Sequence, residues 1–151
     1  MANGVGFEAL TKPGFVVVQP GPASSTPYNG SDVNPAVFST VTTPVVGSTW
    51  TSEIDGGAIG QSGGLTFVLG TRDAVGAGLV LPVGELLLDL TSPFALLDAS
   101  ILIGGLATHA VAVPNDLTLI GSSIATQALL NQSPSGRGQL TNALILTFGV
   151  Y

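Results

Sequence analysis

The sequence predicts an all-β fold. We expect an antiparallel β-sandwich, immunoglobulin-like or jelly-roll-like, of about eight to ten short strands with an extended N-terminal arm. Short apolar and β-branched runs recur at spacings of about 8–12 residues, separated by turn residues. The 151 residues also include 21 Gly and 10 Pro, which interrupt helices of useful length.

Residues 1–35 predict the arm. This region contains Pro13, Pro20, Pro22, Pro27 and Pro35. Proline withholds a backbone N–H group and so interrupts regular strand pairing. The run Phe15-Val16-Val17-Val18 lies between these prolines and is typical of an isolated strand. We therefore divide the chain into an arm of residues 1–35 and a sandwich domain of residues 36–151, and expect the arm to pack on its own domain or on a neighbouring copy.

The sandwich domain has its own sequence of strands and turns. Strands are expected within residues 36–46, 48–54, 65–69, 79–81, 85–90, 99–103, 106–113, 122–132 and 140–151. Gly104-Gly105 predicts a hairpin turn between two of them. One helical turn is expected in residues 114–121, with Asn115 or Asp116 as its cap and Gly121 at its end.

Composition excludes several classes of function. The chain has three Lys and Arg against nine Asp and Glu, a net charge of -6. Nucleic-acid and anionic-lipid binding both need clustered cations, which Lys12, Arg72 and Arg137 are too few to supply. No run of about 18 apolar residues is present, so no membrane insertion by a helix is expected. Cysteine is absent, which removes thiol chemistry, disulfides and Cys-ligated metals.

The first residues carry neither a positive segment nor an apolar segment of the kind that makes a signal peptide. We expect either that an export signal has been removed, or that the protein leaves the cell by another route. Release of a virion component by lysis is one such route.

Several motifs in the second half resemble a known module. They are Leu81-Pro82, Gly105, residues 112–116, Leu119-Ile120-Gly121, Gln127-Ala128-Leu129, Thr141-Asn142-Ala143-Leu144 and Gly149. This set resembles the β-sandwich module common at the C-termini of secreted and surface proteins of planctomycetes and other environmental bacteria. The resemblance spans roughly residues 40–150 and implies a surface or extracellular structural role. It implies no catalytic residues.

No set of residues predicts catalysis. His109, the single histidine, is a candidate general base or metal ligand, but a partly exposed strand residue is the more common outcome. The nucleophile motif Gly-x-Ser-x-Gly is absent. Glu85 and Asp89 flank an apolar triplet and are a candidate glycosidase pair. We disfavour this pair because sugar hydrolases tend to need a much larger aromatic groove than the few aromatic residues of this chain provide. We expect no enzyme activity and no cofactor.

Two candidate ligand sites remain. Glu53 and Asp55, with Asp73 from another loop, form a weak candidate calcium site, although solvated turn carboxylates are more common. A sugar-stacking platform would draw on Tyr28, Phe38, Trp50 and Tyr151. A single tryptophan in a small all-β domain is more often a core anchor.

The shortage of charge predicts self-assembly. A freely diffusing monomer gains solubility from a charged coat, whereas uncharged faces pack against copies of themselves at little desolvation cost. We expect a non-enzymatic extracellular or cell-surface protein that forms a filament, surface layer or shell. Residues 13–19 would join an open sheet edge of the next subunit by strand addition. The alternatives are a virion protein (a capsid decoration or tail) and an adhesion module that binds a glycan.

Overall fold

The computed structural model describes residues 21–132 and 137–151. Within them lie ten strands and two short 3-10 turns, so the expected all-β class is confirmed. The strands are β1 Ser24–Tyr28, β2 Phe38–Thr40, β3 Thr49–Asp55, β4 Gly63–Thr71, β5 Ala74–Leu81, β6 Gly84–Leu88, β7 Ala95–Ile103, β8 Leu106–Ala112, β9 Ser123–Gln132 and β10 Gly138–Thr147. The turns are η1 Gly57–Ile59 and η2 Leu117–Leu119. The run of residues 15–18 lies outside the described part of the chain.

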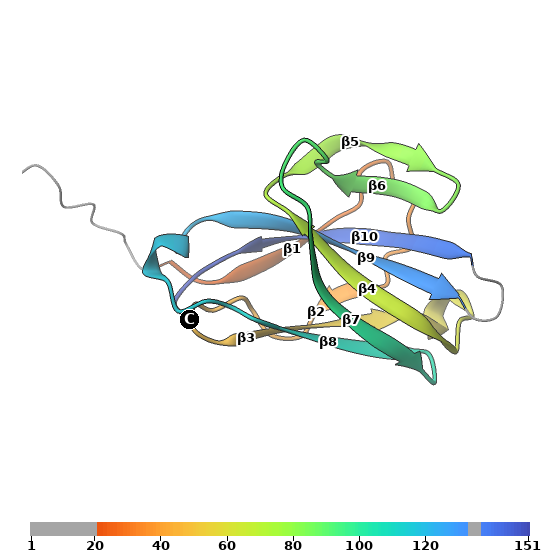
Figure 1. Cartoon of the computed structure of the whole chain (residues 1–151), viewed down its shortest axis with the longest axis horizontal. Coiled ribbons are helices and arrows are strands. Elements are labelled where there is room, and N and C mark those ends of the chain that lie inside the picture. The colour runs from red at the N-terminus through yellow and green to blue at the C-terminus, as the bar shows by residue number, and fades with distance from the viewer. Residues whose placement is uncertain (1–20, 133–136) are drawn as a thin grey trace, which may run out of the picture.

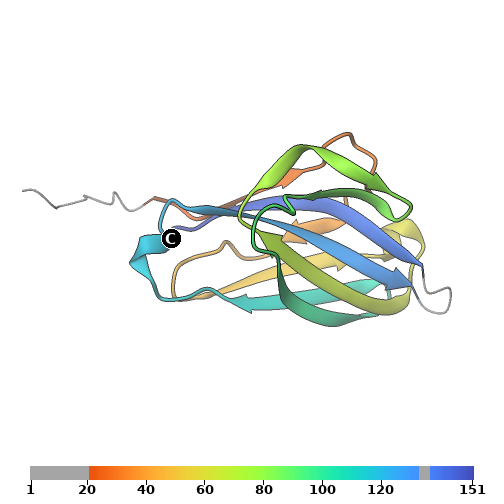
Figure 2. The same ribbon diagram turned by 45° about the horizontal axis from the view of Figure 1, so that its top comes forward.

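The main sheet is a nearly closed barrel, so the expected sandwich is wrong. Eight strands follow the order β1-β10-β9-β4-β7-β8-β3-β2, and every pair is antiparallel. The last strand of this order, β2, comes round against β10 (Figures 1 and 2). Alternation of polar and apolar residues does not distinguish two stacked sheets from one sheet that curls on itself, because both have one buried face.

The Asn142 side chain forms hydrogen bonds that join β10 to β2. The register of β10 against β9 shifts between Leu140 and Ala143, which is a β-bulge. Asn142 lies in this bulge, and its Oδ1 accepts from the Phe38 N–H at 2.9 Å while its Nδ2 donates to the Phe38 carbonyl at 2.9 Å. The backbone N–H of Asn142 also donates to the Pro35 carbonyl at 3.0 Å. The amide thus takes the place of a paired residue where β2 and β10 have no ladder.

Apolar side chains fill the barrel. The buried cluster consists of Phe38, Trp50, Ile54, Val68, Leu102, Ala107, Val113, Ala128, Leu130, Leu144, Leu146 and Phe148. Trp50 is 2% exposed and meets Phe38 edge to face at 6.3 Å, which confirms its expected role as a core anchor. The Trp50 Nε1 donates to the Thr40 hydroxyl at 2.9 Å, so the buried ring keeps a hydrogen bond.

The hairpin of β5 and β6 forms a second, two-stranded sheet that covers the outer side of β9 and β10 (Figure 1). Gln127, on the outer side of β9, is fully buried beneath it. Its Oε1 accepts from the Leu87 N–H at 2.9 Å, and its Nε2 donates to the Glu85 and Thr141 carbonyls at 2.8 Å each. Asn34 bonds both backbone groups of Glu85 at 2.7 Å. Side-chain amides therefore hold the hairpin to the barrel.

Glu85 is a buried carboxylate at the centre of this hairpin contact. Its Oε2 accepts from the Ser31 N–H at 3.0 Å, and its Oε1 accepts from the Gly78 N–H at 2.9 Å and from the Ser31 hydroxyl at 3.2 Å. The Ser31 N–H, supported by the Gly78 N–H and the Ser31 hydroxyl, lowers the pKa of Glu85 against the opposing effect of desolvation. The structure therefore favours the ionised form.

The described chain starts beside its own C-terminal end. β1, which falls within the predicted arm of residues 1–35, pairs with β10 from Ser24–Thr147 to Tyr28–Ala143. Pro27 is tolerated there because β1 is an edge strand. The Val150 N–H donates to the Gly21 carbonyl at 3.1 Å, and a Cβ on Gly149 would collide with the backbone of residues 21–23.

The local turn chemistry agrees with expectation. Gly104 and Gly105 both have positive φ, 61° and 90°, as a two-residue hairpin turn requires. Asp116 caps η2 by accepting from the Thr118 N–H at 2.9 Å, and Gly121 is left-handed with φ 79°. Within the described residues, no helix has the length and apolar character needed to cross a membrane.

We expect Asn142→Ala to destabilise the fold by about 2–4 kcal/mol, because it leaves both buried backbone groups of Phe38 without partners. Urea unfolding measures the change as a lower midpoint. Asn131→Ala, on the exposed part of β9, is the matched control and should shift stability by less than about 0.5 kcal/mol. Equal unfolding midpoints for the two variants would show that Asn142 does not close the barrel.

Glu85 makes stability depend on pH. Its pKa in the folded protein lies below the ordinary 4.5, so its stabilising effect is present above pH 4.5 and is lost as pH falls through the folded value. We expect Glu85→Gln to be less stable than the wild type at pH 7, with a smaller further loss on acidification. Urea midpoints at pH 7 and about pH 3.5 test this. Asn131→Ala, an exposed substitution on β9 that removes no carboxylate, is the control and should keep the wild-type pH dependence.

Candidate functional site: a wedge and two hollows at the barrel wall

The barrel wall opens between β7 and β8. Among the described residues, these two strands are paired at Ile103 and Leu106 alone, next to their connecting turn. Beyond that point β7 follows β4 as far as the Gly70–Ala95 pair, and β8 follows β3 as far as the Thr49–Ala112 pair. The two strands diverge from the turn in a wedge, visible in Figures 1 and 2. We call this opening the β7–β8 wedge.

A bulge in β7 contributes to the wedge. Val68 of β4 is opposite Asp98, but the next residue, Leu69, is opposite Leu96, so Leu97 is the extra residue. Leu97 packs against the core, and the neighbouring Asp98 turns toward β8. The Asp98 carboxylate accepts from the Ala110 N–H at 3.3 Å and so replaces one missing ladder bond.

Asp98, His109 and Thr66 form a chain of hydrogen bonds across three strands. The His109 Nδ1 lies 2.9 Å from Asp98 Oδ2, and its Nε2 lies 3.0 Å from the Thr66 hydroxyl. Because a carboxylate only accepts, Nδ1 carries the proton. The single hydroxyl proton of Thr66 then lies between two acceptors, the unprotonated Nε2 and the Ser100 carbonyl. His109 is 1% exposed, so the expectation of a partly exposed strand residue is wrong. The odd-numbered side chains of β8 point into the barrel.

Burial governs the protonation of His109. Desolvation lowers its pKa, while the hydrogen bond and the charge of Asp98 act in the opposite direction. The net pKa lies below the ordinary 6.5, so the neutral imidazole is the form at neutral pH. Since the unfolded chain takes up a proton first, this histidine contributes stability above pH 6.5, which is lost as pH falls through the folded value.

The order of groups, carboxylate to imidazole to hydroxyl, is that of a hydrolase triad. Here Thr66 is fully buried, and its hydroxyl also lies 3.2 Å from the Ser100 carbonyl. A nucleophile must reach its substrate, and this hydroxyl faces packed protein. The chain of bonds instead fastens β7, β4 and β8 together beside the wedge.

An apolar hollow of about 270 Å³ lies at the wide end of the wedge, away from the turn that connects β7 and β8. We call it the barrel mouth. Its lining comes from β3, β7, β8, β9, β10 and the adjoining loops: Pro44, Trp50, Leu97, Val111, Ala112, Val113, Pro114, Ile124, Leu146 and Phe148. Every one of these side chains is apolar, so the barrel mouth suits hydrocarbon or aromatic groups.

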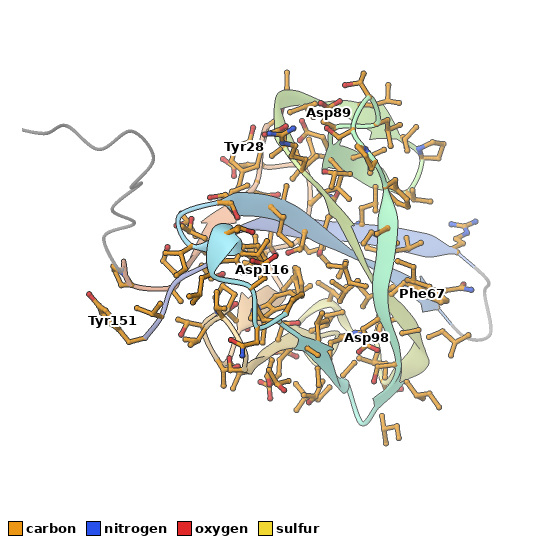
Figure 3. All side chains as sticks on the ribbon, turned by 60° about the vertical axis from the view of Figure 1, so that its left-hand side comes forward. Tyr28, Phe67, Asp89, Asp98, Asp116 and Tyr151 are labelled. Atoms are coloured by element: carbon orange, nitrogen blue, oxygen red, sulfur yellow. The ribbon has the colours of Figure 1, made fainter. Side chains whose placement is uncertain are left out.

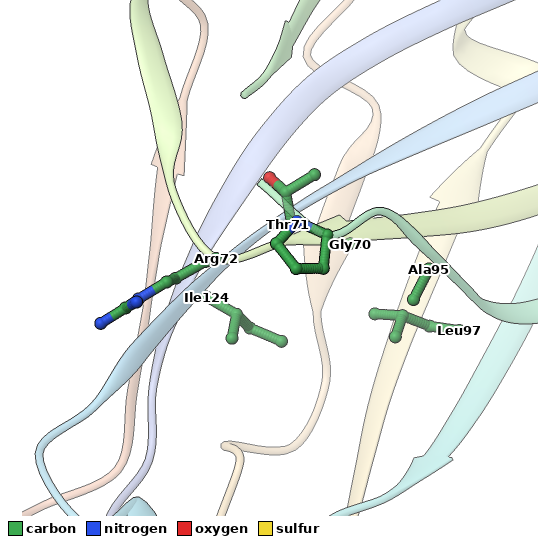
Figure 4. A pocket seen from close by; sticks show the side chains of 7 residues that line it. Gly70, Thr71, Arg72, Ala95, Leu97 and Ile124 are labelled. Atoms are coloured by element: carbon green, nitrogen blue, oxygen red, sulfur yellow. The ribbon is translucent and has the colours of Figure 1, made fainter. Parts of the chain in front are cut away.

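A second hollow of about 350 Å³ lies next to the barrel mouth (Figure 4). It is lined by Gly70, Thr71, Arg72, Pro93, Ala95, Leu97 and Ile124. Leu97 and Ile124 line both hollows, so the two are neighbours along one path. Figure 4 shows the Arg72 side chain directed away from Leu97, which leaves an apolar floor between them.

The outer side of the barrel carries a separate feature, which we call the apolar face. It consists of Leu65 on β4, Leu96, Ile101 and Ile103 on β7, and Leu106 on β8. Their exposed fractions run from 47% for Leu106 to 73% for Ile103. The register places Leu65 opposite Ile101 and Ile103 opposite Leu106, so these side chains are cross-strand neighbours.

The structure does not bring the predicted calcium ligands together. Asp55 ends β3 near the start of β4, whereas Asp73 follows the end of β4, nine residues long. Asp55 accepts from the Ala58 N–H at 3.0 Å, as a turn cap does. Glu53 lies within β3. Residues 21–132 and 137–151 contain no group of three His, Asp or Glu side chains placed to hold a metal.

The residues of the candidate aromatic platform, which we considered less common than a core anchor, are also dispersed. Phe38 and Trp50 are buried, Tyr28 donates to the Val75 carbonyl at 2.9 Å, and Tyr151 is exposed at the far end of the chain (Figure 3). The disfavoured glycosidase pair has separate partners too. Glu85 is fully buried, whereas Asp89 caps the following turn through Thr91 at 2.7–2.9 Å.

Comparison with protein-family models, with curated proteins and with solved structures yields no match. The resemblance to the planctomycete surface module therefore stays a prediction. The wedge, the two hollows and the apolar face are the features of the molecule that bear on its function.

One part of the site was within reach of sequence reasoning. A turn at Gly104-Gly105 sets Ser100 opposite His109 and places Asp98 on the same face, one pair further along. That parity makes Asp98 a natural neighbour of His109. The bulge at Leu97 and the separation of the strands had no comparable signal.

We expect the titration midpoint of the His109 ring, measured by NMR, to lie below pH 6.5. The imidazole signals are readily assigned because the chain has one histidine. In Asp98→Asn the midpoint should fall further, because the carboxylate that raises the pKa is gone. Asp55→Asn is the control and should leave the midpoint unchanged. A wild-type midpoint above 6.5 would contradict the buried, neutral histidine.

Proposed function

We propose that this protein is a non-enzymatic structural protein that assembles with copies of itself outside the cell or at its surface. The observation that carries the proposal is the apolar face. Four large aliphatic side chains, Leu65, Ile101, Ile103 and Leu106, are neighbours on one side of the barrel, and Leu96 lies further along β7 on the same side. Each is about half exposed or more. Contiguous exposed apolar side chains of this kind mark association sites in soluble proteins.

Energetics supports association through this face. Burying an aliphatic side chain contributes about 1.5–3 kcal/mol, and these side chains are already about half buried, so each adds roughly half that amount. Five such contributions offset a useful part of the entropy lost on association, which is about 4–15 kcal/mol. The apolar face therefore contributes to association, and further contacts repeated along an assembly have to supply the remainder.

The charge distribution also supports a homotypic partner. Charged residues make up 8% of the chain, and the apolar face has none among its members. A partner with a similarly uncharged surface leaves no buried ion without a counter-ion. A second copy of the same chain has such a surface, because it has the same low content of charged residues.

Two alternatives to this role were expected, a virion protein and a glycan-binding module. A virion decoration or tail protein would use the same face against its own copies. A glycan-binding module needs an accessible aromatic surface, and the burial of Phe38 and Trp50 removes two of the four candidate residues from that role. We therefore place the structural role first.

Sedimentation velocity and electron microscopy at neutral pH test the proposal. We expect assemblies in the wild type, and in the variant Ile101→Lys with Ile103→Lys a concentration for assembly at least about tenfold higher. Tenfold corresponds to about 1.4 kcal/mol, well within the contribution of two partly buried isoleucines.

Leu79→Lys with Val80→Lys is the matched control, because both residues are exposed aliphatics on β5, outside the apolar face. It introduces the same charge and should assemble as the wild type does. A monomeric wild type at high concentration would overturn the proposed function.

A further inference from the structure

We propose that the β7–β8 wedge accepts residues 15–18 of a second copy of the chain as an added strand. The inference rests on the proposed self-assembly and names the segment and the surface that carry it. It combines an unpaired strand edge, two adjoining apolar hollows and the position of Gly21, the first described residue, at the same end of the barrel.

The wedge provides main-chain partners for a strand. Ala110 turns its N–H toward β7, where Asp98 accepts it. Alternate residues of a strand direct their backbone groups to the same side, so Ala112 presents its N–H and carbonyl to the open part of the wedge. Leu106, another even-numbered residue of β8, pairs with Ile103 of β7 nearer the turn, as this alternation requires. A strand placed beside Ala112 would pair with β8 in the place that β7 no longer occupies.

The hollows provide room for alternate side chains. An added strand beside β8 directs every second side chain into the barrel, toward Trp50, Leu97 and Val111. The barrel mouth and its neighbour, about 270 and 350 Å³, form a path floored by Leu97 and Ile124. A path of successive apolar hollows beside a free strand edge fits an extended apolar peptide better than a compact small molecule. The run Phe15-Val16-Val17-Val18 has this composition.

Gly21, the first described residue, lies at the same end as the barrel mouth. Gly21 bonds to Val150, and Gly149 abuts its backbone. Phe148, one residue earlier, lines the barrel mouth. Residues 15–18 are joined to this point by Gln19 and Pro20.

A second copy is the favoured donor because of Pro20. For the run to fold back onto its own barrel mouth, Gln19 and Pro20 would be the two central residues of a tight turn. Proline is disfavoured at the second of these positions in the common turn types. Donation to a second copy requires no turn at these two residues. Because donor and acceptor surfaces differ, the contact is head to tail and generates filaments or rings.

Disulfide trapping in the cysteine-free chain tests this directly. Two full-length single-cysteine proteins, Val17→Cys and Ala112→Cys, carry different tags and are mixed under mild oxidation. A disulfide forms only when the Cβ atoms approach within about 3.5–4.5 Å, so it reports strand neighbours. Ala112 is exposed, so the substitution is compatible with the fold. We expect a cross-linked heterodimer, and Val16→Cys and Val18→Cys will identify the register.

The control pairs Val17→Cys with Ala58→Cys, an exposed residue of η1 near the β7–β8 turn, away from the barrel mouth. We expect the cross-linked fraction to be at least about tenfold lower, because strand addition holds the cysteines at a high effective concentration in the first pair only. Equal yields in the two pairs overturn the inference. In the double variant Val17→Cys with Ala112→Cys, a purely intramolecular disulfide also overturns it, since the donor is then the same chain.

Sedimentation of the wild type separates the two proposals. If the wild type assembles but the Ala112 cross-link fails at all three arm positions, assembly uses another surface and the wedge is not the acceptor. If the wild type does not assemble, the proposed function fails as well. Val17→Asp gives a readout without cysteine, and it should raise the concentration for assembly at least about tenfold while leaving the unfolding midpoint unchanged.

Discussion

The fold depends on side chains that replace missing backbone pairing. The barrel closes only if β2, the last strand of the sheet order, finds a partner on β10, and β2 is three residues long. Asn142, held outside the regular ladder by a bulge, bonds both backbone groups of Phe38 and so joins β10 to β2. Asn34 and Gln127 act in the same way on β6. A buried amide has the donor and acceptor spacing of a peptide group, which is why these residues can complete a sheet from its side.

Between β7 and β8, side chains replace the missing backbone pairing only in part. Asp98 replaces one ladder bond, and the His109–Thr66 chain ties the strands together from inside. Beyond it the wall stays open, with apolar side chains where a further strand would lie. The barrel wall is therefore paired near the β7–β8 turn, whereas at the barrel mouth a strand edge has no neighbouring strand. This asymmetry gives the acceptor proposal its physical basis, and the outer apolar face is the second surface proposed for assembly.

Low charge and buried polarity belong together in this chain. The described polar side chains that matter most, Glu85, Gln127, Asn142 and His109, are all buried and hydrogen-bonded inside the molecule. They specify how the barrel closes and how the hairpin covers it. The exterior is left with few ions and several exposed aliphatic side chains, a combination that favours contact with similar surfaces over free solvation.

The sequence by itself determined the all-β class, most strand positions, the Gly104-Gly105 hairpin turn and the cap at Asp116, because each depends on neighbours a few residues apart. It also singled out Gln127 and Asn142, within motifs cited for the module resemblance, without revealing their role. Only the tertiary structure decided barrel against sandwich, the burial of His109 and the wedge beside it. Those outcomes depend on bulges at Leu97 and Asn142 and on partners up to about a hundred residues away, and alternation along a strand carries no information about either.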